Sequence, residues 1–227
     1  MVLREGVAAL ISSIRRKLKG NPPRKVIHHI HEWLRDHFLG IETRALDEVP
    51  DADLAKCPDA HHSQATSYGV LSHVLRSIAP DDVFVDLGCG RGRVVCYVAS
   101  RMRLRKVIGV ELMAKMAEFA KQNAAKARLL TPVEIVQGNA AIADLSEGTA
   151  YFLFNPFGEE TLRQVLANIR RSIAASPRTI RILYYNPLFE GLLDACDWLK
   201  AEETIELPFA RVSETKKPFL RIWRSTV

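Results

Sequence analysis

The stretch "VFVDLGCGRGRVV", from Val83 to Val95, places three glycines in alternation with Cys89 and Arg91, directly after an apolar run that contains Asp86 near its end. These glycines are Gly88, Gly90 and Gly92. An apolar run followed by glycines is typical of a buried strand that ends in a tight turn. A backbone without side chains lets a ligand approach closely, so the stretch predicts a binding site at the end of a strand.

Short β-branched runs alternate with amphipathic segments on both sides of this turn. We expect strands at residues 83–87, 106–111, 132–137, 150–154 and 179–185. Helices are expected from Gly92, over 112–127, briefly after Asn139, over a segment containing Leu162 to Ile173, and from Pro187. The last two strand candidates, "EETIELPF" and "PFLRIWRST", have no helix between them. This order predicts a doubly wound α/β fold whose mostly parallel sheet closes with an antiparallel strand.

The first third of the chain has a different pattern. Apolar residues recur at helical spacing from Val2 to Leu18, and a second helix is expected over 24–38. Residues 40–66 predict an irregular connection, followed by a helix that ends at Pro80. We therefore expect a basic helical N-terminal appendage and connection over 1–63, and one domain over 64–227 that carries the glycine turn.

Positive charge is concentrated in the appendage. The chain has a net charge of +6, and residues 1–36 alone contribute +5, from eight bases and three acids. A basic amphipathic helix is typical of a segment that lies on an anionic membrane or binds nucleic acid. It also fits packing on its own domain or on a second copy, and the sequence leaves the oligomeric state undetermined.

Composition indicates a globular protein and restricts the compartment in which it is expected. A chain of 227 residues with 48% hydrophobic content is expected to form a globular core. Its four cysteines form no C-x-x-C pair, which favours a reducing compartment. The apolar run near the start is too short for a bilayer span, and its basic cluster is in the wrong place for a secretory signal. We expect the protein to be in the cytoplasm, either free or at a membrane surface. His28 and His31 are three residues apart but lack a partner at ligand spacing, so no metal is expected.

Glu111 strengthens the interpretation of the glycine turn. It closes the next expected strand, 23 residues after Gly88. A carboxylate in that place accepts both hydroxyls of a ribose. The glycine turn and Glu111 together predict a cofactor that contains a nucleoside.

The spacing of the glycines distinguishes between cofactors. A dinucleotide fingerprint has its third glycine where this chain has Arg93, and here the glycine comes one residue earlier. S-adenosylmethionine presents no pyrophosphate to a helix, so the tighter G-x-G-x-G spacing suits it better. An NAD(P)-dependent oxidoreductase remains the alternative.

Four motifs together resemble a known family. "VDLGCGRG", "GVE" ending at Glu111, "VQGNA" and "FNPF" follow, in this order and spacing, the successive motifs of the class I S-adenosylmethionine-dependent methyltransferases, over about residues 64 to 227. The resemblance implies a Rossmann-like sheet of seven strands with a reversed last strand. That agrees with the hairpin expected above.

The resemblance also assigns contacts with the cofactor. It implies that the methionine part lies against Asp86 and the glycine turn of Gly88, Gly90 and Gly92. The ribose is expected on Glu111. The adenine is expected beside Gly138, Asn139 and Ala140. Apart from the resemblance, Tyr68, with Gln64 and Ser67, precedes the first strand and is expected to form a lid over the cofactor, with plain packing of the tyrosine as the alternative.

The motif "FNPF" points to the methyl acceptor. It resembles a shortened N-P-P-[FY] motif of amino-methyltransferases, which implies catalytic roles for Asn155, Pro156 and Phe157. The Asn155 side-chain carbonyl would accept protons of an amine, and Phe157 would face a planar or cationic group. Alternatively, Asn155 caps the strand end.

The acceptor itself is less defined. A looser resemblance links the chain to histone-lysine methyltransferases without a SET domain and to bacterial relatives. Nitrogen of a protein side chain or a small amine is the favoured acceptor, while oxygen and carbon acceptors stay open. A catalytically silent, cofactor-binding partner subunit is a further alternative.

Overall fold

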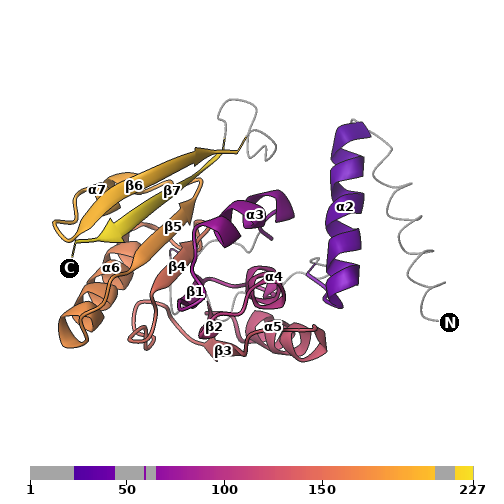
Figure 1. Cartoon of the computed structure of the whole chain (residues 1–227), viewed down its shortest axis with the longest axis horizontal. Coiled ribbons are helices and arrows are strands. Elements are labelled where there is room, and N and C mark those ends of the chain that lie inside the picture. The colour runs from indigo at the N-terminus through magenta and orange to yellow at the C-terminus, as the bar shows by residue number, and fades with distance from the viewer. Residues whose placement is uncertain (1–22, 44–58, 60–64, 208–217, 227) are drawn as a thin grey trace.

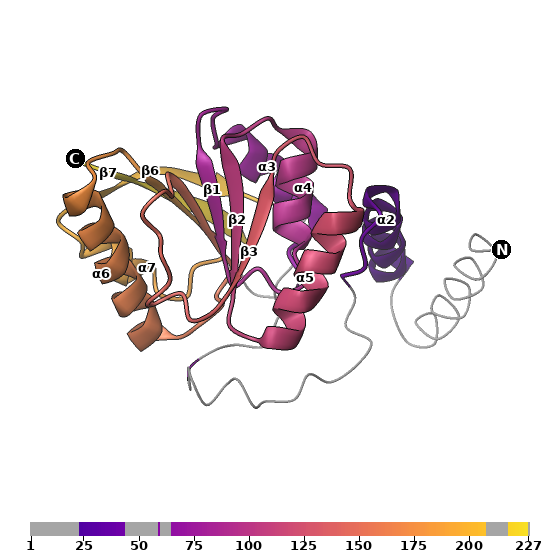
Figure 2. The same cartoon turned by 90° about the horizontal axis from the view of Figure 1, so that it is seen from below.

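The protein is represented by a computed structural model that describes residues 23–43, 59, 65–207 and 218–226. The helix expected over residues 2–18 and the lid residue Gln64 lie outside these ranges. The described chain forms a seven-stranded sheet with helices on both faces (Figures 1 and 2).

The sheet has the order β3-β2-β1-β4-β5-β7-β6. Its strands are β1 (Val83–Leu87), β2 (Lys106–Glu111), β3 (Val133–Gln137), β4 (Ala150–Leu153), β5 (Arg181–Tyr185), β6 (Leu199–Glu206) and β7 (Phe219–Ser225). The strands β1 to β5 pair in parallel, and β7 lies antiparallel between β5 and β6. The predicted α/β sheet with a reversed last strand is confirmed.

The helices cover the sheet in two layers. They are α2 (Pro23–Leu39), α3 (Tyr68–Arg76), α4 (Arg93–Arg101), α5 (Ala114–Lys126), α6 (Glu159–Ala175) and α7 (Glu190–Asp194). Figure 2 shows α4 and α5 on one face of the sheet, α6 on the other, and α2 outside α4. Two hydrophobic clusters, one on each face, result from this arrangement. Because both faces are covered, β1 is buried at every position, including Asp86 within its otherwise apolar sequence.

One predicted element is wrong. The short helix expected after Asn139 is a turn, in which the amides of Ile142 and Ala143 donate to the Asn139 carbonyl. The Asn139 side chain also accepts from the amide of Ala141, at 2.9 Å. An asparagine that bonds its own backbone two residues ahead favours a turn over a helix.

Helix α2 packs against α4, although the sequence assigns it to an appendage. Its Glu32 and Asp36 are buried, and Ile41 just after it joins the core on the α4 side of the sheet. Among the described helices, none is both long and apolar enough to cross a bilayer.

Candidate functional site

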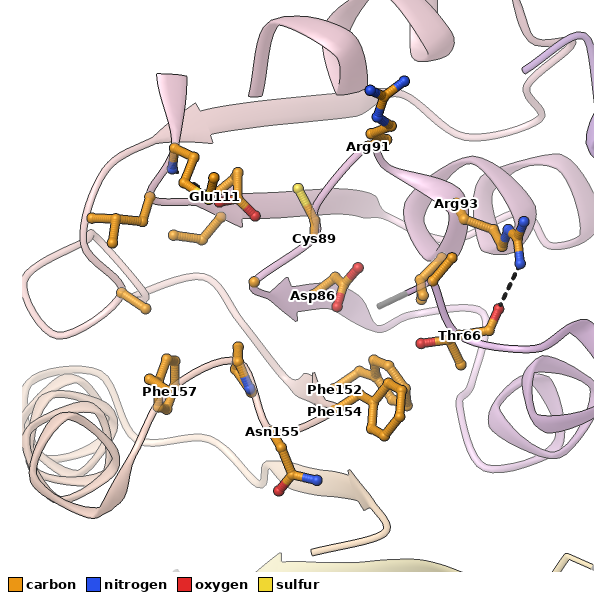
Figure 3. A pocket seen from close by; sticks show the side chains of 18 of the residues that line it. Thr66, Asp86, Cys89, Arg91, Arg93, Glu111, Phe152, Phe154, Asn155 and Phe157 are labelled. Carbon is orange, nitrogen blue, oxygen red and sulfur yellow. Dashed lines mark hydrogen bonds between the residues drawn. The ribbon is translucent and has the colours of Figure 1, made fainter. Parts of the chain in front are cut away.

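A cavity opens at the carboxyl ends of β1, β2 and β4, where the strand order reverses direction around β1. Parallel α/β sheets bind ligands at this switch point. The lining includes nine of the twelve residues predicted for the site, which are Asp86, Gly88, Glu111, Gly138, Asn139, Ala140, Asn155, Pro156 and Phe157. The structure therefore brings the four motifs, which are far apart in the sequence, around one space (Figure 3).

Asp86 carries an unsatisfied carboxylate into this cavity. The residue is 2% exposed, and its Oδ2 atom has no hydrogen-bond partner among the described residues. Burial, and secondly the nearby Glu111 carboxylate, raise the pKa of Asp86 to about 8. A buried acceptor without a partner is costly unless a ligand supplies the donor. The ammonium group of a methionine moiety is such a donor.

Glu111 is held in place by the backbone around it. Its Oε2 accepts from the amide of Gly90 at 2.8 Å, and its Oε1 accepts from the amide of Met113 at 2.9 Å. A carboxylate has about four lone-pair sites and accepts several donors at once. The arrangement suits a carboxylate that receives a pair of ribose hydroxyls while its orientation is fixed by two amides.

The three glycines of the turn have different roles. All three have positive φ, at 81°, 53° and 82° in chain order. Only Gly88 lines the cavity, where an added Cβ would lie 2.3 Å from the Cβ of Pro156. Gly90 donates its amide to Glu111, and Gly92 packs on Ala120 of α5. Gly90 and Gly92 thus make contacts that shape the turn, and their cofactor contacts stay a prediction.

The Gly138–Ala140 segment forms the side of the cavity near Glu111. A Cβ added to Gly138 would meet nothing within 4 Å, so open space lies beside this backbone. The side-chain carbonyl of Asn139, predicted to face adenine, already accepts from Ala141. The open backbone at Gly138 leaves room for a flat ring.

Asn155 differs from its predicted role. Its Oδ1 accepts from the Tyr184 hydroxyl at 2.8 Å and from the Leu188 amide at 3.2 Å, and its Nδ2 donates to the Asn186 carbonyl at 2.9 Å. Figure 3 shows the side chain pointing away from Asp86 and Glu111. The residue has φ 45°, and Asn186 at the end of β5 has φ 48°. The side chain joins two strand-end turns, in agreement with the alternative interpretation as a cap.

Aromatic rings form another part of the wall. Phe152, Phe154 and Phe157 line the cavity, and Phe157 is 6% exposed, in the core on the α6 side of the sheet. The Phe154 ring packs on Tyr185, with 4.5 Å between centroids. These rings make this part of the cavity wall apolar. The face of an aromatic ring attracts a nearby cation.

Tyr68 is packed in the core, in agreement with the alternative to a lid. The residue is fully buried beside α4 and does not line the cavity. Its hydroxyl donates to Asp36 at 2.6 Å. Burial and the Asp36 carboxylate raise the pKa of Tyr68 well above its usual value, so the hydroxyl stays protonated and keeps donating. Ser67 caps α3 by accepting from the amide of Gly69.

Sequence reasoning missed one wall of the cavity. Thr43, Thr66 and Arg93 come from three separate segments and lie together in the lining. In Figure 3, Thr66 and Arg93 are on the opposite side of Asp86 from Glu111. The only signal was Arg93 itself, a charged residue inside the first turn of a helix with apolar neighbours. Its partners are more than 25 residues away, and nothing local predicts them.

Within the described ranges, no group of three or more His, Cys, Asp or Glu side chains is placed to hold a metal ion. The residues present do fit S-adenosylmethionine. The unpartnered Asp86 oxygen suits its ammonium group, Glu111 suits its ribose, and the bare backbone at Gly88 permits close contact.

Comparison with known proteins agrees with this geometry. The family model described as histone methylation protein DOT1 matches residues 65–165, which is less than half of the chain. A protein-lysine N-methyltransferase from Saccharolobus islandicus is 32% identical over 80 residues, covering 35% of this chain and 50% of the relative. A histone-lysine N-methyltransferase, H3 lysine-79 specific, from Caenorhabditis elegans is 44% identical over 45 residues, covering 20% of this chain and 5% of the relative. The chain thus spans at most half the length of these curated relatives.

Solved structures extend the likeness to most of the sheet. An RNA methyltransferase from Salinibacter ruber, in complex with S-adenosyl-L-homocysteine, superposes with a TM-score of 0.52 at 23% identity. The match covers 71% of this chain and 94% of that one. Together with the strand order, the reversed β7 and the cavity at the switch point, this shows that the chain has the fold of the class I S-adenosylmethionine-dependent methyltransferases.

Proposed function

We propose that the protein binds S-adenosylmethionine and transfers its methyl group to a nitrogen, the side-chain amine of a protein lysine. The observation that carries the proposal is the cavity itself. It places the Asp86 carboxylate with its unpartnered Oδ2, the amide-held Glu111 and the "FNPF" turn around one space at the switch point of the sheet. The names of the two curated relatives support lysine as the acceptor.

The protein's part in this reaction is binding and alignment. When bound, the cofactor supplies an electrophilic methyl group and carries its own leaving group. Asp86 holds the ammonium group and Glu111 holds the ribose, so the methyl group points along a defined direction. Alignment of two reactants in a near-attack geometry is a large part of catalysis for such displacements.

The acceptor side is built from the strand-end turn after β4. Pro156 is in contact range of Gly88, which brings this turn against the glycine turn. Because the Asn155 side chain bonds Tyr184, Leu188 and Asn186, we assign it to positioning of Pro156 and Phe157. The aromatic rings of Phe152, Phe154 and Phe157 keep the amine dry and stabilise the positive charge that forms on nitrogen.

Calorimetric titration with S-adenosylmethionine, S-adenosylhomocysteine and NAD tests the cofactor. Binding of the first two and not of NAD is expected. Preference for NAD would overturn the proposal in favour of an oxidoreductase.

Turnover tests the acceptor. The protein is incubated with S-adenosylmethionine and lysine-containing peptides, histone and non-histone, and the products are analysed by mass spectrometry. Methylation of a lysine amine is expected, and peptides with arginine in place of each lysine serve as controls. Cofactor binding without methylation of any protein, peptide or small amine would favour the silent-subunit alternative.

A further inference from the structure

The structure assigns to helix α2 a positioning role in the cofactor site: Glu32 and Asp36 hold Arg93, and through it the wall formed by Thr43 and Thr66. This inference rests on the proposed function, because the wall belongs to the same cavity. It makes α2 an integral part of the binding site, not an appendage beside it.

The guanidinium of Arg93 is fully engaged by α2 and its neighbours. Its Nη1 donates to Glu32 at 2.7 Å and its Nη2 donates to Asp36 at 2.8 Å. Its Nε donates to the Thr43 hydroxyl at 2.9 Å, and Nη1 also reaches the Thr66 carbonyl at 3.3 Å. All three charged side chains are at most 10% exposed. One side chain therefore joins α2, the residue Thr43 after it and Thr66 before α3 to the first residue of α4.

The position of Arg93 explains why it depends on these carboxylates. It is the first residue of α4, directly after the glycine turn. A cation at a helix N-terminus opposes the helix dipole, and a buried cation is costly unless it is paired. Glu32 and Asp36 offset both costs, because their negative charges pair with the buried cation and lie near the N-terminus of α4. Glu32 also accepts from the amide of Tyr68 at 3.1 Å. Loss of either carboxylate therefore releases the side chain that defines the wall.

Glu32 and Asp36 also offset the charge of Arg93. Arg93 lines the cavity near Asp86, whereas the two carboxylates that pair with it are not part of the lining. Because the pairing offsets its positive charge, Arg93 repels the cationic end of S-adenosylmethionine less than an unpaired guanidinium would. Docking of α2 and binding of the cofactor are expected to support each other, because coupling between two such sites is reciprocal.

The decisive variant is Asp36→Asn, with Asp82→Asn as matched control. Asp36 accepts from an arginine, a threonine hydroxyl and a tyrosine hydroxyl, and is 2% exposed. Asp82 accepts from Arg181, the Thr149 hydroxyl and the Ala79 amide, and is 6% exposed, but it lies at the amino end of β1, away from the cavity. Both changes break a buried ion pair.

Calorimetry with S-adenosylhomocysteine is run on both variants, with thermal unfolding alongside. We expect Asp36→Asn to weaken binding about tenfold or more, in the usual range of coupling between sites. Asp82→Asn should lose stability and keep the parent's affinity. Equal affinity in Asp36→Asn and the parent, or equal losses in both variants, would overturn the positioning role. Failure of the parent to bind would refute the proposed function as well.

If Asp36→Asn fails to fold, hydrogen exchange on the unaltered protein tests the positioning role of α2. On addition of S-adenosylhomocysteine, amide exchange in α2 is expected to slow together with that of the glycine turn. Slowing in the turn with unchanged exchange in α2 would contradict the inference.

Discussion

At the scale of single residues, buried Asp86 is expected to lower the stability of the folded protein and to contribute to cofactor binding. Its pKa of about 8 lies above the usual value for a carboxyl group, because the charged form is buried without a partner. A group whose pKa is raised by folding stabilises the folded state at low pH. That contribution is lost as the pH rises through its folded pKa.

Replacing Asp86 with Asn should therefore flatten the pH dependence of stability. In the parent, the free energy of unfolding contributed by this group falls between about pH 4 and about pH 8. The Asp86→Asn variant should be more stable than the parent at about pH 8 and bind S-adenosylmethionine at least about tenfold more weakly. Urea unfolding at both pH values and calorimetry check the two parts. Parent-like pH dependence in the variant would show that Asp86 is ionised normally.

Glu111 gives a second prediction at this scale. Glu111→Gln keeps the size of the side chain but replaces one acceptor oxygen by a donor, which faces either Gly90 or Met113. We expect S-adenosylhomocysteine to bind about 10²-fold more weakly, since hydrogen bonds to a charged group are worth about 1.5 to 3 kcal/mol each. Calorimetry measures the affinity, and circular dichroism checks the fold. Unchanged affinity would remove Glu111 from the ribose.

At the scale of elements, two turns meet at the cavity, and Gly88 is their contact. Gly88→Ala adds a Cβ 2.3 Å from that of Pro156 at a residue with φ 81°. The added methyl group must push the β4 turn away, so both stability and cofactor affinity should fall. Gly191→Ala is the control, because its Cβ meets nothing within 4 Å. A Gly88→Ala protein with normal affinity would mean that the two turns move independently.

The turn after β4 depends on Asn155 for both its side chain and its backbone. Asn155→Ala loses the hydrogen bonds to β5 and its turn, and also puts alanine at φ 45°, which costs about 1 to 2 kcal/mol. Asn155→Gly loses the same hydrogen bonds without that strain. We expect both variants to bind cofactor nearly normally and turn over slowly, with Asn155→Ala the less stable. Normal turnover in a folded Asn155→Gly variant would show that the turn after β4 does not position the methyl acceptor.

At the scale of the whole molecule, charge is unevenly distributed. Residues 1–36 carry +5 of the net +6. We propose that this region adds affinity for an anionic partner, either a membrane surface or nucleic acid. Removal of residues 1–20 should then abolish binding to anionic vesicles or to polynucleotide, and binding by the full chain should fall steeply with salt. Sedimentation and gel-shift assays check the two partners. If the full chain binds neither at low salt, a role in packing or self-association replaces this proposal.

The sequence by itself determined the sheet and the place of the site. Short β-branched runs separated by amphipathic segments predicted the parallel strands, because burial on both faces requires each such strand to be apolar along its own length. The glycine turn and Glu111 pointed to the cavity for the same reason: a turn with positive φ depends on its own residues.

Only the tertiary structure decided which side chains face the ligand. Asn155 turns toward Tyr184 and Leu188, Tyr68 turns toward Asp36, and Arg93 is enclosed by α2, all through partners 25 or more residues away. A local pattern says which residues share a turn, but not which distant donor or acceptor each side chain meets. Because a buried polar group must find a partner, that choice follows from the packing of the whole chain.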